Sequence, residues 1–139
     1  MIQIISGTKG SGKSKQLIDI ANEALAKESG FVVFIDDDKR YMYDLKREIR
    51  FVDATDYKAF SGYSAETFLA FVSGMLAANF DITLVCIDGL LKLTNAQPEA
   101  LESFFVQLSQ ISENHSCNFV VAMSAETEKL PESIRKYCI

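Results

Sequence analysis

Short apolar runs recur along the chain, separated by longer stretches in which apolar residues repeat at helical spacing. Five of the runs are almost continuous and rich in β-branched residues, which is typical of strands buried on both faces of a parallel sheet. The predicted strands span 2–5, 31–35, 49–52, 82–87 and 119–123.

Three of the intervening stretches carry apolar residues three and four positions apart, which predicts helices that cover a sheet. They run from Leu17 to Leu25, from Phe68 to Leu76 and from Leu101 to Ile111. We expect Gly30 to stop the first helix, and Pro98 stands where the first turn of the third helix tolerates proline. The polar segment 36–48 suits a short helix or an ordered loop, and the segment 128–139 is expected to cover the edge of the first strand or to serve a partner.

The alternation of strands and helices predicts an α/β fold: a three-layer αβα sandwich around a mostly parallel five-stranded sheet. With 139 residues, the chain has the length of a single domain over 1–139. No apolar run approaches the roughly 20 residues of a membrane-spanning helix, and no export signal is recognisable at the N-terminus, so we expect a cytoplasmic protein. The net charge of −5 argues against a broad nucleic-acid surface, and three cysteines without paired spacing do not suggest a zinc site.

The segment between the first strand and the first helix reads G-T-K-G-S-G-K-S at residues 7–14, which fits G-x-x-x-x-G-K-[ST] at every fixed position. In that context, backbone N–H groups and a helix N-terminus are directed at one anion. We expect Lys13 to contact the β- and γ-phosphates of a nucleotide and Ser14 to ligate Mg²⁺. The alternative is a glycine-rich turn with a chance lysine and serine. The predicted phosphate-binding residues are Gly7, Thr8, Lys9, Gly10, Ser11, Gly12, Lys13, Ser14 and Lys15.

A second candidate metal ligand, Asp88, directly follows the predicted strand 82–87. Because parallel strands end on one edge of their sheet, Asp88 is expected to reach the metal bound by Ser14. An acidic residue at a strand end is weak evidence alone, and the phosphate loop is what makes it informative. Together the two segments predict a site for Mg²⁺ and a nucleoside triphosphate.

The order of these parts resembles that of the RecA-like ATPases over nearly the whole chain. The loop and its helix are followed by F-I-D-D-D at residues 34–38, then by the strand that ends at Asp88, then by F-V-V-A-M-S-A at 119–125. The resemblance implies a sheet order of 1-5-4-2-3 and places Asp38 where the family has the acid that orients the attacking water. The chain is also similar to small bacterial ATP-binding proteins labelled as twitching-motility proteins of PilT type.

Several positions depart from the RecA-like pattern. The family usually has glutamate where Asp38 stands, one methylene longer, and Asp36 or Asp37 could take the role instead. The acidic triplet could also be a solvated strand end. Ala125, next to Ser124, occupies the position of the family's sensor glutamine. These departures lead us to expect slow hydrolysis.

The leading functional prediction is therefore a Mg²⁺-dependent ATP-binding protein, with Lys13 and Asp38 as catalytic residues of a slow ATPase. The alternative is a nucleotide-dependent switch or adaptor with little turnover. A small-molecule kinase ranks last, because no lid or acceptor pocket is evident. Arg40, the best placed of the arginines, could supply the cation that hydrolysis needs, or a second copy or another protein partner could supply it.

Overall fold

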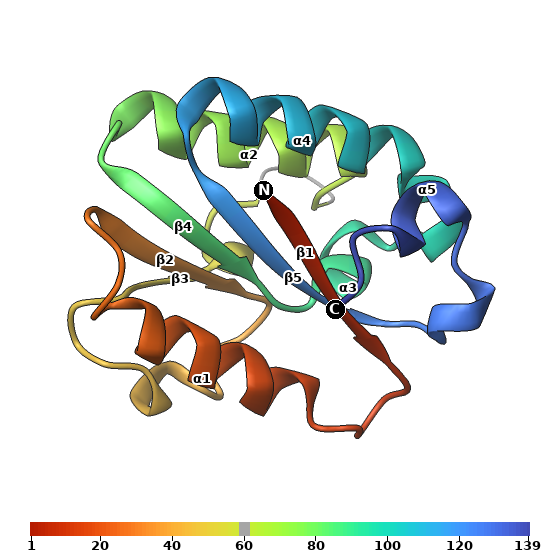
Figure 1. Cartoon of the computed structure of the whole chain (residues 1–139), viewed down its shortest axis with the longest axis horizontal. Helices are drawn as coiled ribbons and strands as arrows, with labels where there is room; N and C mark the ends of the chain where they lie inside the picture. Colours follow the sequence, from red (N-terminus) through yellow and green to blue (C-terminus); the bar gives the residue numbers. More distant parts are fainter. Residues whose placement is uncertain (59–61) are drawn as a thin grey trace.

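Five strands form one sheet in this computed structural model, which describes residues 1–58 and 62–139. Every strand pairing is parallel, and the order β1-β5-β4-β2-β3 confirms the predicted one (Figure 1). The strands are β1 (Ile2–Gly7), β2 (Phe31–Asp36), β3 (Arg50–Asp53), β4 (Ile82–Ile87) and β5 (Asn118–Ser124).

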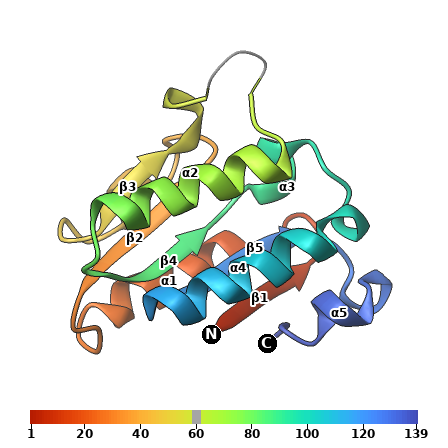
Figure 2. The same cartoon turned by 90° about the horizontal axis from the view of Figure 1, so that it is seen from above.

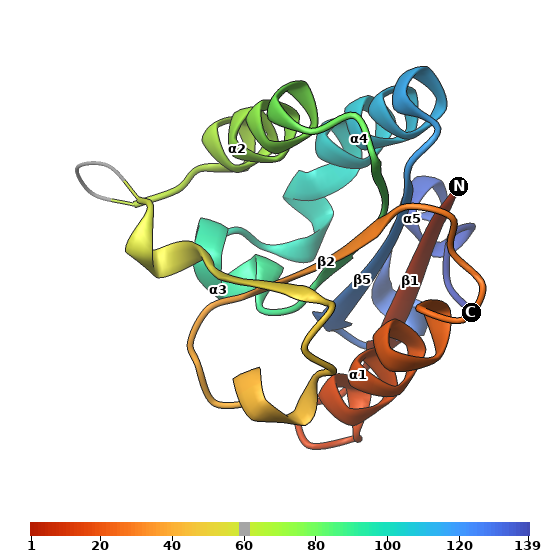
Figure 3. The ribbon, with the colours of Figure 1, turned by 90° about the vertical axis from the view of Figure 1, so that its left-hand side faces the viewer.

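Helices cover both faces of the sheet, so the predicted three layers are confirmed. The helix α1 (Lys13–Ala24) lies on one face, and α2 (Ala65–Ala78) and α4 (Glu102–His115) lie side by side on the other (Figures 2 and 3). Along the described parts of the chain, no helix combines the length and the apolar character needed to cross a membrane. The short helical elements are α3 (Leu90–Thr94), α5 (Glu132–Arg135), η1 (Met42–Asp44), η2 (Ala54–Asp56), η3 (Pro98–Leu101) and η4 (Thr127–Lys129).

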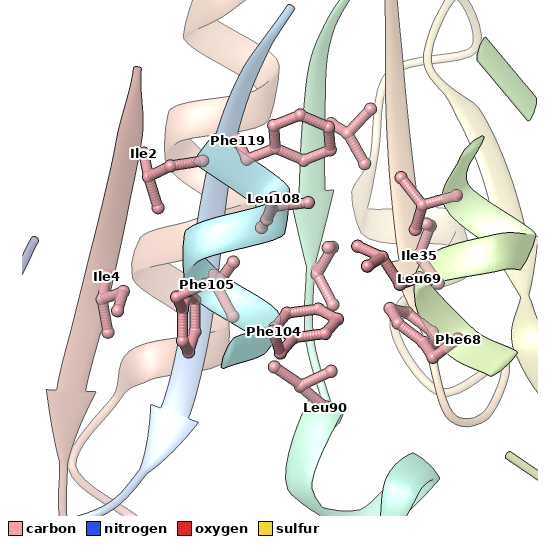
Figure 4. Packing of buried hydrophobic residues seen from close by; sticks show 14 of the residues in the cluster. Ile2, Ile4, Ile35, Phe68, Leu69, Leu90, Phe104, Phe105, Leu108 and Phe119 are labelled. Atoms are coloured by element: carbon pink, nitrogen blue, oxygen red, sulfur yellow. The ribbon is translucent and has the colours of Figure 1, made fainter. Parts of the chain in front are cut away.

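Two apolar clusters, one on each face of the sheet, form the core. Successive residues of a strand point to opposite faces, so Ile4 joins the cluster under α2 and α4 while Ile5 joins the one under α1. Phe68 and Phe104 bring the apolar stripes of α2 and α4 together over the sheet (Figure 4). Burial on both faces is the physical reason for the continuous apolar runs in the strands.

The C-terminal segment covers the outer edge of β1, which confirms one of the two roles predicted for it. The backbone N–H of Ile4 donates to the Tyr137 carbonyl at 2.9 Å, and the N–H of Ile139 donates to the Ile4 carbonyl at 3.0 Å. The buried side chain of Ile134 holds α5 against the core. These bonds satisfy the backbone N–H and carbonyl of Ile4 on the outer edge of β1.

Gly30 has a different role from the predicted one. The helix α1 ends at Ala24, well before this glycine. Gly30 instead lies where β2 approaches β4: the N–H of Phe31 donates to the Asp81 carbonyl at 2.7 Å, and a Cβ at Gly30 would clash with the same carbonyl oxygen. The segment 36–48 contains the short helix η1, as expected.

We expect Gly30→Ala to lower the free energy of unfolding by about 1–3 kcal/mol, because the added methyl group meets backbone that cannot move aside. Gly74→Ala is the matched control. Gly74 lies within α2, and a Cβ there would meet open space. Alanine at Gly74 is expected to raise stability by about 0.5–1 kcal/mol. Urea unfolding measures both, and equal effects of the two substitutions would contradict the close approach at Gly30.

Candidate functional site

The loop between β1 and α1 wraps around the amino group of Lys13. Gly10 and Gly12 adopt left-handed backbone angles, φ 84° and 88°, which strain any residue with a side chain, and Gly12 directly precedes α1. The Lys13 Nζ donates to the Thr8 carbonyl at 2.7 Å. The loop therefore holds the lysine at the N-terminus of α1, where a helix attracts anions.

Lys13 is largely buried, with 9% of its surface exposed. Burial lowers the pKa of the Lys13 ammonium, and the negative charge of Asp88 acts in the opposite direction. A cation in this position is stabilised by an anion, because the surrounding protein replaces much of its water. A phosphate group meets that requirement.

Ser14 and Asp88, the two predicted metal ligands, are in direct contact. The Ser14 Oγ donates to the Asp88 Oδ2 at 2.7 Å, although the residues are 74 positions apart in sequence. The backbone N–H of Asp88 donates to the Ile35 carbonyl at 2.8 Å, which ties the end of β4 to the end of β2. Hydroxyl and carboxylate oxygens are ligands that suit Mg²⁺.

Asp36 ends β2 and lies almost entirely inside the protein, with 2% of its surface exposed. Its Oδ1 accepts a hydrogen bond from the N–H of Asp37 at 2.7 Å, whereas its Oδ2 has no hydrogen-bond partner among the described residues. Burial, the neighbouring Asp37 carboxyl and the charge of Asp88 raise the pKa of Asp36 to about 8. This environment favours the neutral form of Asp36.

Asp37 is paired with a residue that the sequence analysis did not single out, Lys92 of α3. The Lys92 Nζ lies 3.2 Å from the Asp37 Oδ2. Burial favours the neutral form of Asp37, but the neighbouring Asp36 carboxyl and the ion pair with Lys92 outweigh it and hold the pKa of Asp37 below its ordinary value. The sequence contained one signal for Lys92: it follows Asp88 by about one helical turn.

Asp38 is more exposed than Asp36 and Asp37, although one carboxylate oxygen from each of the three residues lies within 4.8 Å of the others. Its side chain is 40% exposed and accepts hydrogen bonds from the backbone and the guanidinium of Arg40, at 2.9 and 3.2 Å. Asp36 and Asp37 line the cavity beside the phosphate loop, and Asp38 is not among its lining residues. The role of Asp38 in orienting water stays a prediction.

The cavity has a volume of about 1150 Å³ and joins the phosphate loop to the ends of β2 and β4. Gly7, Thr8 and Ser11 support the loop from within: Gly7 donates to the Ala125 carbonyl at 2.9 Å, while Thr8 and Ser11 contact Lys13. The predicted residues that line the cavity itself are Lys9, Gly10, Gly12, Lys13, Ser14, Lys15 and Asp88, together with Arg40 and Ser124.

Comparison with known proteins bears on the fold. No family model matches the sequence, and no curated protein matches it. Among solved structures, a KaiC-like protein from the hyperthermophilic archaeon Pyrococcus horikoshii OT3 is similar, with a TM-score of 0.66 over 98% of this chain and 68% of that one. The chain has a RecA-like fold. At 14% identity the likeness extends to the fold alone, and the resemblance to PilT-type proteins stays an expectation.

The raised pKa of Asp36 predicts a specific dependence of stability on pH. In the unfolded chain this carboxyl titrates near pH 4, whereas in the folded protein its pKa is about 8. Between those values the folded state holds an extra proton, so the free energy of unfolding falls as the pH rises. Asp36→Asn removes the titrating group and with it this pH-dependent fall in the free energy of unfolding. We therefore expect the Tm of Asp36→Asn to exceed that of the wild type by a few degrees at pH 8 and by less at pH 5.

Thermal unfolding without nucleotide across this pH range measures the effect. Asp81→Asn, a change at an exposed acid, is the control and is expected to leave the pH profile as it is in the wild type. Parallel profiles for the wild type and Asp36→Asn would show that Asp36 is ionised throughout.

Proposed function

We propose that the protein binds Mg²⁺·ATP in the cavity beside the β1–α1 loop and hydrolyses it slowly. The observation that carries this proposal is the 2.7 Å contact between Ser14 and Asp88, next to Lys13, a residue that is largely buried. Two oxygen ligands beside a phosphate-binding lysine are what Mg²⁺ and a triphosphate require. The RecA-like fold supports nucleotide binding at this edge of the sheet.

The chain's own groups fit such a ligand. Lys13 exchanges its bond to the Thr8 carbonyl for the β- and γ-phosphates, and the loop's N–H groups bind phosphate oxygens. Ser14 and Asp88 hold the Mg²⁺, which when bound neutralises negative charge on the phosphates. Lys9 and Lys15 add positive charge at the rim of the cavity.

Hydrolysis requires a carboxylate that orients water toward the γ-phosphate. The resemblance favours Asp38, whereas the geometry supports Asp37, which lines the cavity and whose pKa is held low. The side chains of Asp37 and Asp38 are each one methylene shorter than the glutamate of the RecA-like pattern. Either carboxylate would therefore hold the attacking water less closely, and slow turnover follows. We propose that a second copy or another partner supplies a further cation in the active state.

A nucleotide-dependent switch with little turnover is the second candidate. One observation favours it: burial favours the neutral form of Asp36, and Asp37 is paired with Lys92, so both members of the acidic triplet that line the cavity are engaged. In that state, nucleotide binding proceeds without an acid to orient water. ATP and ADP then differ in the conformation they stabilise.

Replacing the phosphate-binding lysine tests the binding site. Lys13→Ala is expected to weaken ATP binding at least about tenfold, because a charge-assisted contact to phosphate is lost. Ser14→Ala is expected to reduce the dependence of binding on Mg²⁺. Titration calorimetry measures both, with Lys27→Ala, a change at an exposed lysine beyond α1, as the control. If millimolar ATP gives the wild type neither heat nor a thermal shift, the proposal is wrong.

Replacing each acid in turn tests hydrolysis. We expect Asp37→Asn to lower the rate of phosphate release about 100-fold while ATP affinity changes about twofold or less, since general-base groups contribute on that scale. Asp38→Asn and Asp81→Asn are expected to have small effects. A large loss in Asp38→Asn instead would assign the role to the acid that the resemblance favours. Equal rates in every variant, with a partner captured only when nucleotide is present, would identify the switch.

A further inference from the structure

Lys92 and Asp37 form an ion pair between a fixed group and a movable one. The side chain of Asp37 is 8% exposed, whereas that of Lys92 is 76% exposed. Lysine carries its charge at the end of a flexible four-carbon chain, so Lys92 can leave this carboxylate without moving the backbone. Both residues line the cavity that contains Lys13 and Ser14.

The backbone that carries Lys92 is held firmly beside the metal ligands. Gly89 adopts a left-handed conformation, φ 75°, and a Cβ there would lie 2.7 Å from the Asp37 Oδ1. This close approach lets α3 begin directly after Asp88. The fully buried Leu90 then anchors α3 in the core. Lys92 is therefore held on a short helix that begins next to Asp88, and it lines the same cavity as Ser14 and Asp88.

Two other cations of the cavity are paired with acids that are more exposed. Arg40 pairs with the more exposed Asp38 at 3.2 Å, and Lys15 pairs with Asp19 of its own helix at 3.4 Å. Lys92 differs because its partner is a buried acid. When Lys92 leaves, Asp37 loses the ion pair that offsets its burial and has a carboxylate oxygen free to accept a hydrogen bond.

A terminal phosphate competes well for Lys92. It carries more negative charge than a single carboxylate and offers three acceptor oxygens, so it forms stronger charge-assisted hydrogen bonds. A diphosphate, which ends one phosphate earlier, does not extend as far from Lys13. The pairing of Lys92 therefore depends on whether the third phosphate is present.

Building on the proposed ATP binding, we propose that Lys92 senses the γ-phosphate. Lys92 pairs with Asp37 when the third phosphate is missing and moves to it when a triphosphate is bound. The same movement frees the Asp37 carboxylate to accept a hydrogen bond from water. Recognition of the substrate and availability of the water-orienting acid are thus coupled through one side chain.

Nucleotide affinities test this role without relying on turnover. The dissociation constants of Mg²⁺·ADP and of a non-hydrolysable Mg²⁺·ATP analogue are measured for the wild type, Lys92→Met and Lys92→Arg. Lys92→Met is expected to weaken binding of the ATP analogue about tenfold, the effect of losing one charged contact, and to leave ADP binding within about twofold. Lys92→Arg, which keeps the charge, is expected to restore most of the loss.

Lys129→Met is the matched control, because Lys129 is similarly exposed and also pairs with an acid, Glu126, at 3.1 Å. If thermal melting shows that the Lys92→Met protein is not folded, Lys92→Gln is used in its place. Equal losses for the two nucleotides, or no loss for either, overturn the role of Lys92 and leave the proposed function standing. A wild-type protein that binds neither nucleotide overturns both.

Discussion

The hydrogen bond between Ser14 and Asp88 joins two segments that lie 74 residues apart, and it exists because β1 and β4 end on the same edge of one parallel sheet. β5 lies between the two strands, so the contact depends on the central part of the sheet being correctly assembled. The bond from Asp88 to the Ile35 carbonyl extends the same edge to β2 and its acids. Every candidate functional group is positioned by this alignment of strand ends.

Charge is concentrated at that edge in an environment with little water. Lys13, Asp36 and Asp37 are each largely buried, and their pKa values are displaced in different directions by burial and by neighbouring polar and charged groups. Burying charged groups in this way destabilises the protein without ligand, and a bound ligand of opposite charge compensates for that destabilisation. Groups held in this way need little rearrangement when a phosphate and a metal arrive, which is the basis of electrostatic preorganisation.

The rest of the molecule holds the carboxyl ends of the strands, where the candidate site lies, in place. The apolar clusters on the two faces keep the strands in register, and the C-terminal segment closes the side of β1 that leads into the phosphate loop. Glycines act where backbone approaches another group closely: Gly89 beside Asp37, and Gly30 beside the Asp81 carbonyl. A side chain at either position would push apart elements that the site requires to be in contact.

The sequence by itself determined the elements and the phosphate loop, because both depend on local patterns. Buried strands need continuous apolar runs, covering helices need apolar stripes, and the G-x-x-x-x-G-K-S segment carries its own glycines and charge. The order of the strands came from the resemblance to RecA-like ATPases, since no local pattern encodes which strands become neighbours.

Only the tertiary structure decided which acids lie in the cavity. Asp36, Asp37 and Asp38 are adjacent and chemically identical, yet the ends of β2 and β4 enclose the first two and leave the third with Arg40. The role of Lys92 was missed, because its partner Asp37 lies more than 50 residues away in sequence. The role of Gly30 was misjudged for the same reason, because the backbone that it approaches, at Asp81, is similarly distant. Burial and long-range contact set these roles, and neither is a property of a residue's immediate neighbours in the chain.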